Sequence, residues 1–201
     1  MEDIKRIYLF KFILVILVCF ISFYVKAQTT SSAVDNNRHF VFYGGVGPNY
    51  YFNNLVKAKD KVNEFNYSFV GRVMWEPEHL LSIGIESGYY RLYTLNVTQP
   101  TKVHIANSAI PIQLVVSMKF LKTFYGNFAI GRSILLNKVD SQDYGNFDAS
   151  LLSLADISLT VGHKRRLNDK ISLGAETKFY YSSKANDKNL ALLFVCGYRF
   201  H

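Results

Sequence analysis

The feature that most constrains this chain is an alternation of apolar and polar residues that recurs in eight separate segments. In residues 65–75, for example, Phe65, Tyr67 and Phe69 share one face, and Asn66 and Ser68 share the other. A period of two residues is typical of β-strands whose two faces meet different surroundings. Because no long stretch after residue 39 has a helical period, the pattern predicts an all-β domain.

The lengths of the connections indicate how these strands are arranged. We expect strands at residues 39–52, 65–75, 80–93, 104–120, 124–136, 151–162, 170–181 and 189–200. Short turns are expected at 76–79, 121–123 and 163–169, longer polar loops at 53–64, 94–102 and 137–149, and an intermediate one at 182–188. Tight periplasmic turns that alternate with longer outer loops are typical of outer-membrane barrels, and an even strand number puts both termini on the periplasmic side. Pro111 lies inside one strand and predicts a bulge or a later strand start, because proline cannot donate a ladder hydrogen bond.

The N-terminus has the pattern of an export signal. Residues 7–25 are almost entirely apolar and follow Lys5 and Arg6, and Val25 and Ala27 supply small residues before Gln28. This pattern predicts a cleavable signal peptide over residues 1–27. A polar N-terminal tail (28–38) and a barrel domain (39–201) would follow. An uncleaved helical anchor stays open as an alternative, although Lys11 interrupts the apolar run.

Composition and charge exclude several classes of protein and of site. The mean hydropathy of +0.06 is too low for a protein with several membrane helices, but it fits a transmembrane barrel or a soluble β-protein. The net charge of +8 could attract anionic lipid or nucleic acid, and since no nucleic-acid motif is present we interpret it as solvated charge near a membrane. Cys19 lies in the leader, so Cys196 alone remains, which excludes an internal disulfide and a cysteine metal site.

The minor face of the strands carries charges at mid-strand positions together with many glycines. The interior of an eight-stranded barrel is just wide enough for side chains, and buried charges are tolerated only when they are paired. We therefore expect a structural plug of paired lumen charges, in a barrel that does not conduct. Its members are Arg72, Lys119, Lys178 and Arg199 with Glu86, Asp156 and Glu176. A soluble, lipocalin-like periplasmic barrel with the apolar face inward is the open alternative.

Aromatic residues gather near the expected strand ends on the apolar face, as they do in membrane girdles. The periplasmic girdle would contain Trp75, Phe120, Phe124, Tyr198 and Phe200, and the outer girdle Phe65, Tyr93 and Tyr181.

No segment carries a convincing catalytic or ligand motif. His104 and Ser108 loosely resemble the His/Ser site of lipid A deacylase barrels, but their spacing departs from that pattern. Residues 44–47 are glycine-rich without the Lys-Ser/Thr of a phosphate loop, and the acidic residues 140–148 lack the spacing of a calcium loop. We therefore expect no enzyme activity, and no catalytic, cofactor-binding or metal-binding residues.

One strand motif is similar to a known family. Residues 110–114 (Ile-Pro-Ile-Gln-Leu) resemble the I-P-L-type strand of the small outer-membrane β-barrels widespread in Bacteroidota, the PorT-like group, and the leader end Lys26-Ala27-Gln28 resembles that group's export signals. The final Tyr198-Arg199-Phe200 is similar to the aromatic end read by the barrel-insertion machinery, although His201 follows it. The resemblance implies an eight-stranded antiparallel up-and-down transmembrane β-barrel in the outer membrane. Its partners would be outer-membrane lipid and, during biogenesis, the insertion machinery.

These observations together predict a non-enzymatic outer-membrane barrel with a structural role, or one that presents loops 53–64 and 137–149 to a protein partner. A role as an accessory factor in protein secretion follows from analogy with the PorT-like group alone. Two more functions stay open, a membrane-embedded enzyme that acts on lipid and the soluble binder of an apolar ligand.

Overall fold

The computed structural model describes residues 39–52, 62–77, 81–97, 102–121, 123–141, 145–184 and 186–200. They belong to one compact unit, Asn37–His201. The predicted signal peptide (1–27) and nearly all of the polar tail (28–38) precede this unit, and both lie outside the described residues.

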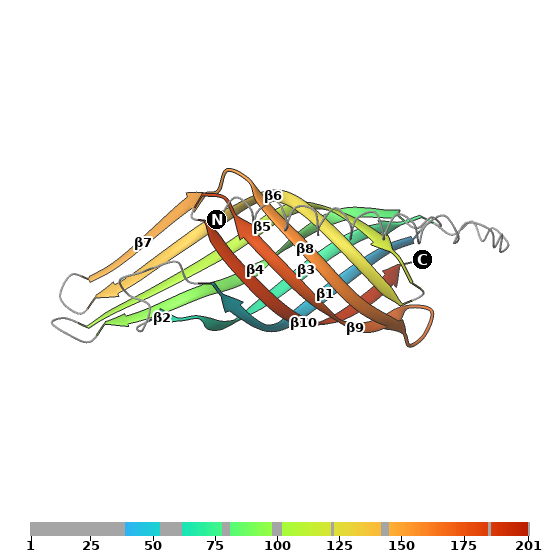
Figure 1. The fold of residues 1–201 in the computed structure, drawn as a ribbon, viewed down its shortest axis with the longest axis horizontal. Coiled ribbons are helices and arrows are strands. Elements are labelled where there is room, and N and C mark those ends of the chain that lie inside the picture. Colours follow the sequence, from blue (N-terminus) through green and yellow to red (C-terminus); the bar gives the residue numbers. More distant parts are fainter. Residues whose placement is uncertain are drawn as a thin grey trace, which may run out of the picture. The chain divides into compact units, whose positions relative to one another are not determined.

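The described residues form antiparallel strands that close into a barrel (Figure 1). The strands are β1 (His39–Tyr51), β2 (Val62–Asn63), β3 (Phe65–Glu76), β4 (Leu81–Val97), β5 (Val103–Lys119), β6 (Phe124–Ser141), β7 (Gly145–Leu152), β8 (Asp156–Arg166), β9 (Ile171–Ser182) and β10 (Asp187–Phe200). Eight of them follow the order β4-β3-β1-β10-β9-β8-β6-β5, and pairing of β5 with β4 closes the ring. Strands β2 and β7 are additions at one end. The predicted eight-stranded antiparallel barrel is confirmed.

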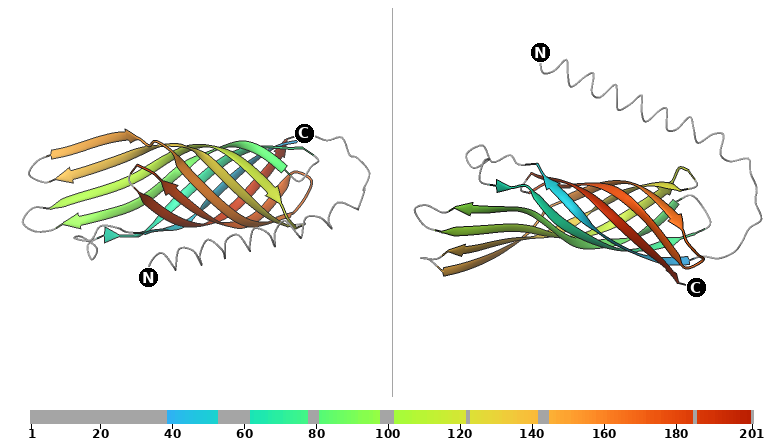
Figure 2. Two further views of the ribbon diagram at one scale, coloured as in Figure 1. Left: turned by 45° about the horizontal axis from the view of Figure 1, so that its top comes forward. Right: turned by 90° about the horizontal axis from the view of Figure 1, so that it is seen from below.

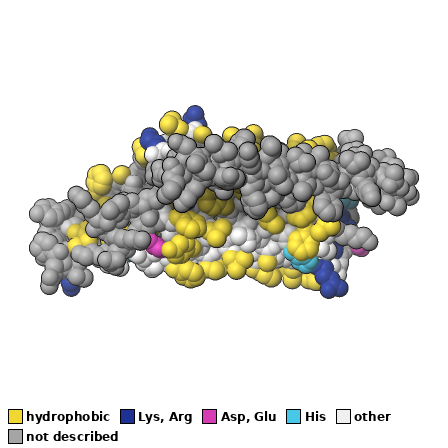
Figure 3. All heavy atoms as spheres, viewed as in Figure 1, with side chains coloured by type: hydrophobic (Ala, Val, Ile, Leu, Met, Phe, Trp, Pro, Cys, Tyr) yellow, Lys and Arg dark blue, Asp and Glu magenta, His cyan; other side chains and the backbone are white. Residues whose placement is uncertain are grey.

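The apolar face of every barrel strand points outward. Leu114 is 65% exposed and Val161 is 59% exposed, and large apolar side chains cover the outer wall where it is visible in Figure 3. The alternate residues point inward and include buried charges such as Arg72 and Glu176. An apolar exterior around a polar lumen is the arrangement of a barrel in lipid. The soluble alternative needs the opposite arrangement.

The two ends of the barrel differ in construction. The connections at residues 77–80, 120–123 and 167–170 are short, and the described chain begins and ends on the same side as these turns. We assign this end to the periplasm, because short turns mark the periplasmic side of such barrels. No helix in the described part of the chain is long and apolar enough to cross a membrane.

The opposite end carries a sheet that continues beyond the barrel, and two predicted loops are corrected there. Residues 94–97 are the end of β4, which runs to Val97, and β5 starts at Val103. Residues 137–141 belong to β6, and residues 145–149 belong to β7. These strand ends form an open sheet in the order β2-β4-β5-β6-β7, which we call the outer extension (Figure 2). A sheet outside lipid needs no continuous apolar face, so the alternation that marks the barrel strands fades in these strand ends.

A β-bulge at the base of the outer extension turns one predicted girdle residue, Tyr93, to the other face of its strand. The β4–β5 register shifts between Arg91 and Tyr93, and an extra residue in a strand inverts the faces that follow it. Tyr93 consequently packs against lumen-facing Tyr51, with 5.1 Å between ring centroids, and does not join the outer girdle. The strand containing Pro111 does not start late, because it pairs with β6 at Ser133 in regular register. The bulge lies on β4, on the neighbouring strand.

Candidate functional site in the barrel lumen

The centre of the lumen holds a network of four buried charges. Arg72 on β3 donates from Nε to Glu86 Oε2 at 2.8 Å, and its Nη2 lies 2.9 Å from Glu176 Oε1 on β9. Lys178, also on β9, contacts the other oxygen of Glu86. All four residues are at most 3% exposed, and the two cations balance the two carboxylates. Since β1 and β10 separate β3 from β9 in the ring, the network crosses the lumen.

Glycines make room for two lumen tyrosines, one beside the central network and one beside Glu76. A Cβ atom added at Gly162 would lie 2.5 Å from the Tyr125 ring, and one at Gly197 would lie 2.5 Å from the Tyr43 ring. Each ring therefore lies against the barrel wall where no side chain projects. From these positions Tyr125 donates to Glu176 Oε2 at 2.8 Å, and Tyr43 donates to Glu76 Oε1 at 2.5 Å.

A second cluster surrounds Glu76 at the periplasmic end. Lys119 Nζ lies 3.0 Å from Glu76 Oε2, Lys164 Nζ lies 3.0 Å from Oε1, and Arg199 Nη2 lies 4.0 Å from Oε2. Lys164 also donates to the Tyr43 hydroxyl. This cluster has three cations for one carboxylate and opens into a cavity of about 410 Å³.

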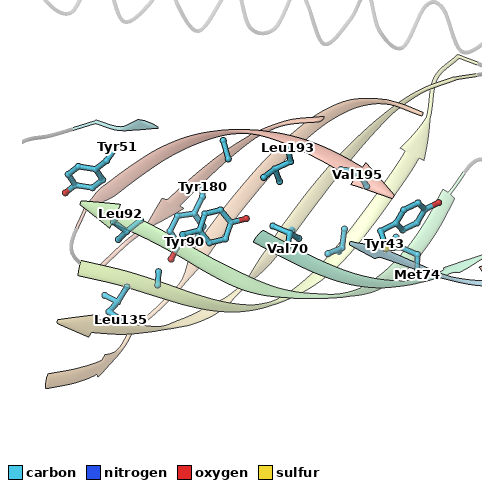
Figure 4. Close-up of a cluster of buried hydrophobic side chains, with 14 of the residues drawn as sticks. Tyr43, Tyr51, Val70, Met74, Tyr90, Leu92, Leu135, Tyr180, Leu193 and Val195 are labelled. Carbon is cyan, nitrogen blue, oxygen red and sulfur yellow. The ribbon is translucent and has the colours of Figure 1, made fainter. Parts of the chain in front are cut away.

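Buried aromatic and aliphatic side chains are distributed along the lumen (Figure 4), and those of Tyr51, Tyr90, Leu92 and Tyr180 lie in its outer half. Tyr90 and Tyr180 stack with ring centroids 5.2 Å apart, and both are fully buried. Tyr180 donates to Asp156 Oδ2 at 2.8 Å, and Tyr51 donates to Asp187 Oδ1 at 2.6 Å. Charges, polar groups and rings thus occupy successive levels of the lumen.

The structure places all seven residues of the predicted plug on the lumen side, but in three different environments. Arg72, Glu86, Glu176 and Lys178 form the central network. Lys119 and Arg199 instead contact Glu76. Asp156 accepts from Tyr180 and has no ion pair among the described residues.

Sequence reasoning missed two members of the periplasmic cluster, Glu76 and Lys164. The sequence pattern puts them in turns, at 76–79 and 163–169, whereas β3 includes Glu76 and β8 runs to Arg166. Continuing the alternation from Arg72 and from Asp156 by steps of two would have put both on the lumen face.

The weak His/Ser resemblance does not correspond to a paired site. His104 Nδ1 lies 2.5 Å from Asn96 Oδ1, while the Ser108 hydroxyl lies 2.7 Å from that of Tyr89. In the part of the chain that the structure describes, no three His, Cys, Asp or Glu residues are grouped so that they could hold a metal ion.

Comparison with known proteins supports the fold. No family model matches the chain, and none of the curated proteins matches it, so the PorT-like resemblance stays a prediction. Among solved structures, Ail of Yersinia pestis in complex with the heparin analogue sucrose octasulfate aligns at 11% identity with a TM-score of 0.54, covering 82% of this chain and 99% of Ail. Neisserial surface protein A aligns at 12% identity with a TM-score of 0.51, covering 80% of this chain and 97% of that protein. The chain therefore has the fold of the small outer-membrane β-barrels, in agreement with the predicted outer-membrane location.

Proposed function

We propose that this protein is a non-conducting, non-enzymatic outer-membrane barrel that anchors the outer extension and presents it to a partner. The observation that carries this proposal is the charge network of Arg72, Glu86, Glu176 and Lys178, which crosses the lumen between β3 and β9. A pore needs a continuous water path, and here buried side chains span the barrel at mid-height.

Two further levels of side chains support a closed lumen. The Glu76 cluster lies on the periplasmic side of the network. On the outer side lies the stacked pair Tyr90 and Tyr180, both without exposed surface. An eight-stranded barrel leaves little interior space beyond its own side chains, so three occupied levels leave no channel.

Conductance in planar lipid bilayers tests the closed lumen. The refolded mature chain should insert without producing steady single-channel currents, and a porin in the same bilayers serves as the positive control. Insertion is checked separately by the mobility difference between unboiled and boiled protein on a gel. Large, steady currents from correctly folded protein would overturn the proposal.

The outer extension has an exposed strand edge to which another protein can bind. All eight residues of edge strand β7 are exposed except Ala149, which is half-buried, and Phe147 on this strand is 66% exposed. Among the described strands β7 pairs only with β6, so its other edge offers backbone groups that no described strand pairs. Exposed edges with apolar side chains are the surfaces to which extended protein segments add as an extra strand. A protein partner on the cell exterior fits this surface best.

Photo-crosslinking on intact cells tests this role. A crosslinking residue at position 147 should capture a protein partner, and one at position 159, which points to lipid on β8, should not. Shortening the β6–β7 hairpin should abolish the adduct while the barrel still resists unfolding before boiling. Equal labelling from both positions would contradict the proposal.

A role in protein secretion is the second candidate, and it rests on the resemblance of residues 110–114 to the PorT-like group. A deletion strain that secretes an unchanged set of proteins would refute it.

A further inference from the structure

We infer that the periplasmic mouth of the lumen is a binding site for a phosphate or carboxylate group of a periplasmic molecule. The cavity of about 410 Å³ at this end is the basis. Six basic side chains line it, namely Lys119, Lys164, Arg165, Arg166, Lys170 and Arg199. Among the described lining residues only Glu76 and Asp169 carry negative charge. We call this cavity the basic vestibule.

At the periplasmic end of the lumen, the described cations of the basic vestibule outnumber the described carboxylates. The central network has two cations and two carboxylates, whereas Glu76 alone faces Lys119, Lys164 and Arg199. The single negative charge of Glu76 neutralises one of these three cations. The other two create a positive potential in a concave site with low-dielectric walls. Such a site concentrates anions.

The donors that surround Glu76 remain accessible from the vestibule. The Glu76 side chain is only 8% exposed, but those of Lys119, Lys164 and Arg199 are 31%, 20% and 16% exposed. Their ammonium and guanidinium groups can therefore contact a second anion without leaving Glu76. Lysine and arginine donate several hydrogen bonds each, so one carboxylate does not saturate three of them.

The position of these side chains favours an anion from the periplasm over a lipid headgroup. Tyr43, Lys164 and Glu76 touch one another across the lumen, from β1, β8 and β3. The surrounding lipid lies on the other side of the barrel wall, against the outward-facing apolar residues. An acidic group that enters from the periplasmic side reaches the cations without crossing that wall.

Glu76 is then a resident anion that competes with the ligand for Lys119, Lys164 and Arg199. Replacing Glu76 with Gln keeps the shape of the side chain and removes its charge. The anion affinity of the vestibule should then rise, by about tenfold if one such charge is worth a single factor of ten. If Glu76 served only to plug the lumen, its replacement by Gln would not raise the anion affinity.

Calorimetric titration of pyrophosphate into the refolded mature chain in zwitterionic nanodiscs tests the inference. We expect measurable binding that weakens as salt is added, because the ion pairs at the mouth are partly exposed. Glu76→Gln should tighten binding, and the double variant Lys119→Gln, Arg199→Gln should weaken it by about tenfold or more. The matched control Lys184→Gln, Lys188→Gln removes two charges at the opposite end of the barrel and should leave the affinity unchanged.

The inference would be overturned by an absence of binding to the wild type, by unchanged affinity in Glu76→Gln, or by an equal loss of affinity in the control pair. Each variant is first checked for the heat-dependent gel shift, so that misfolded protein is not mistaken for lost binding. Anionic phosphatidylglycerol in the nanodisc should not lower the affinity for pyrophosphate. Competition by that lipid would assign the vestibule to a lipid headgroup and would contradict a periplasmic ligand.

Discussion

Replacing Arg72 with Met tests how much the central network contributes to stability. The guanidinium makes four contacts with carboxylate oxygens, of 2.7 and 2.8 Å to Glu86 and of 2.9 and 3.4 Å to Glu176. Without it, Lys178 would be the only cation in the network for two carboxylates that are 1% and 2% exposed. Removing one partner of a buried ion pair costs about 3–5 kcal/mol, because a buried charge is left uncompensated. We expect Arg72→Met to lower the free energy of unfolding by that amount.

A second substitution should recover much of this loss. Arg72→Met combined with Glu176→Gln restores neutrality and keeps the Lys178–Glu86 pair, so we expect it to be more stable than Arg72→Met by about 2 kcal/mol. Urea unfolding in lipid vesicles, followed by the fluorescence of the single Trp75, measures both values. Lys184→Met, which removes an exposed charge, should change stability by less than about 0.5 kcal/mol. A loss below about 1 kcal/mol for Arg72→Met, or no recovery in the double variant, would refute the reasoning.

The remaining predictions use the same unfolding assay. Gly162→Ala should cost about 1–3 kcal/mol because its Cβ would overlap the Tyr125 ring, while Gly126→Ala, whose nearest contact would be 3.7 Å, should be tolerated. An equal loss of stability in the two variants would argue against a close approach of the Tyr125 ring to the barrel wall at Gly162. Leu114→Arg on the lipid face should cost about 2–4 kcal/mol, and a neutral result would place that face out of lipid. Tyr51→Phe should cost about 1–3 kcal/mol by removing a hydrogen bond to buried Asp187, and no change would show that this bond is dispensable.

The fold could be predicted because membrane barrels impose a period of two residues on every strand. The residues expected on the two faces of 65–75, 81–90 and 189–200 lie on those faces in the structure. Lipid on one side and a narrow polar lumen on the other put different demands on alternate residues. That contrast is visible in the sequence without any knowledge of the pairing.

The parts of the structure that the sequence did not predict lie where the strands no longer separate lipid from the lumen. The outer extension has water on its surfaces, so its strands lack the alternation and their sequence predicts loops at 94–102 and 137–149. Tyr93 follows a bulge, and the sequence does not reveal where an extra residue inverts the faces. Glu76 and Lys164 lie near the ends of their strands, where charged residues are equally typical of a periplasmic turn. The pairing of Glu76 with Lys119, Lys164 and Arg199 depends on closure of the barrel, which brings together residues that are far apart in the chain.

The most direct test of a closed barrel in the membrane is the gel mobility of the protein extracted from isolated outer membranes, unboiled against boiled. A closed barrel with a filled lumen resists detergent unfolding, so the unboiled protein should migrate as a separate band that disappears on boiling. A single band under both conditions, with the protein recovered from the soluble periplasmic fraction, would contradict the outward orientation of the apolar face and with it the whole account.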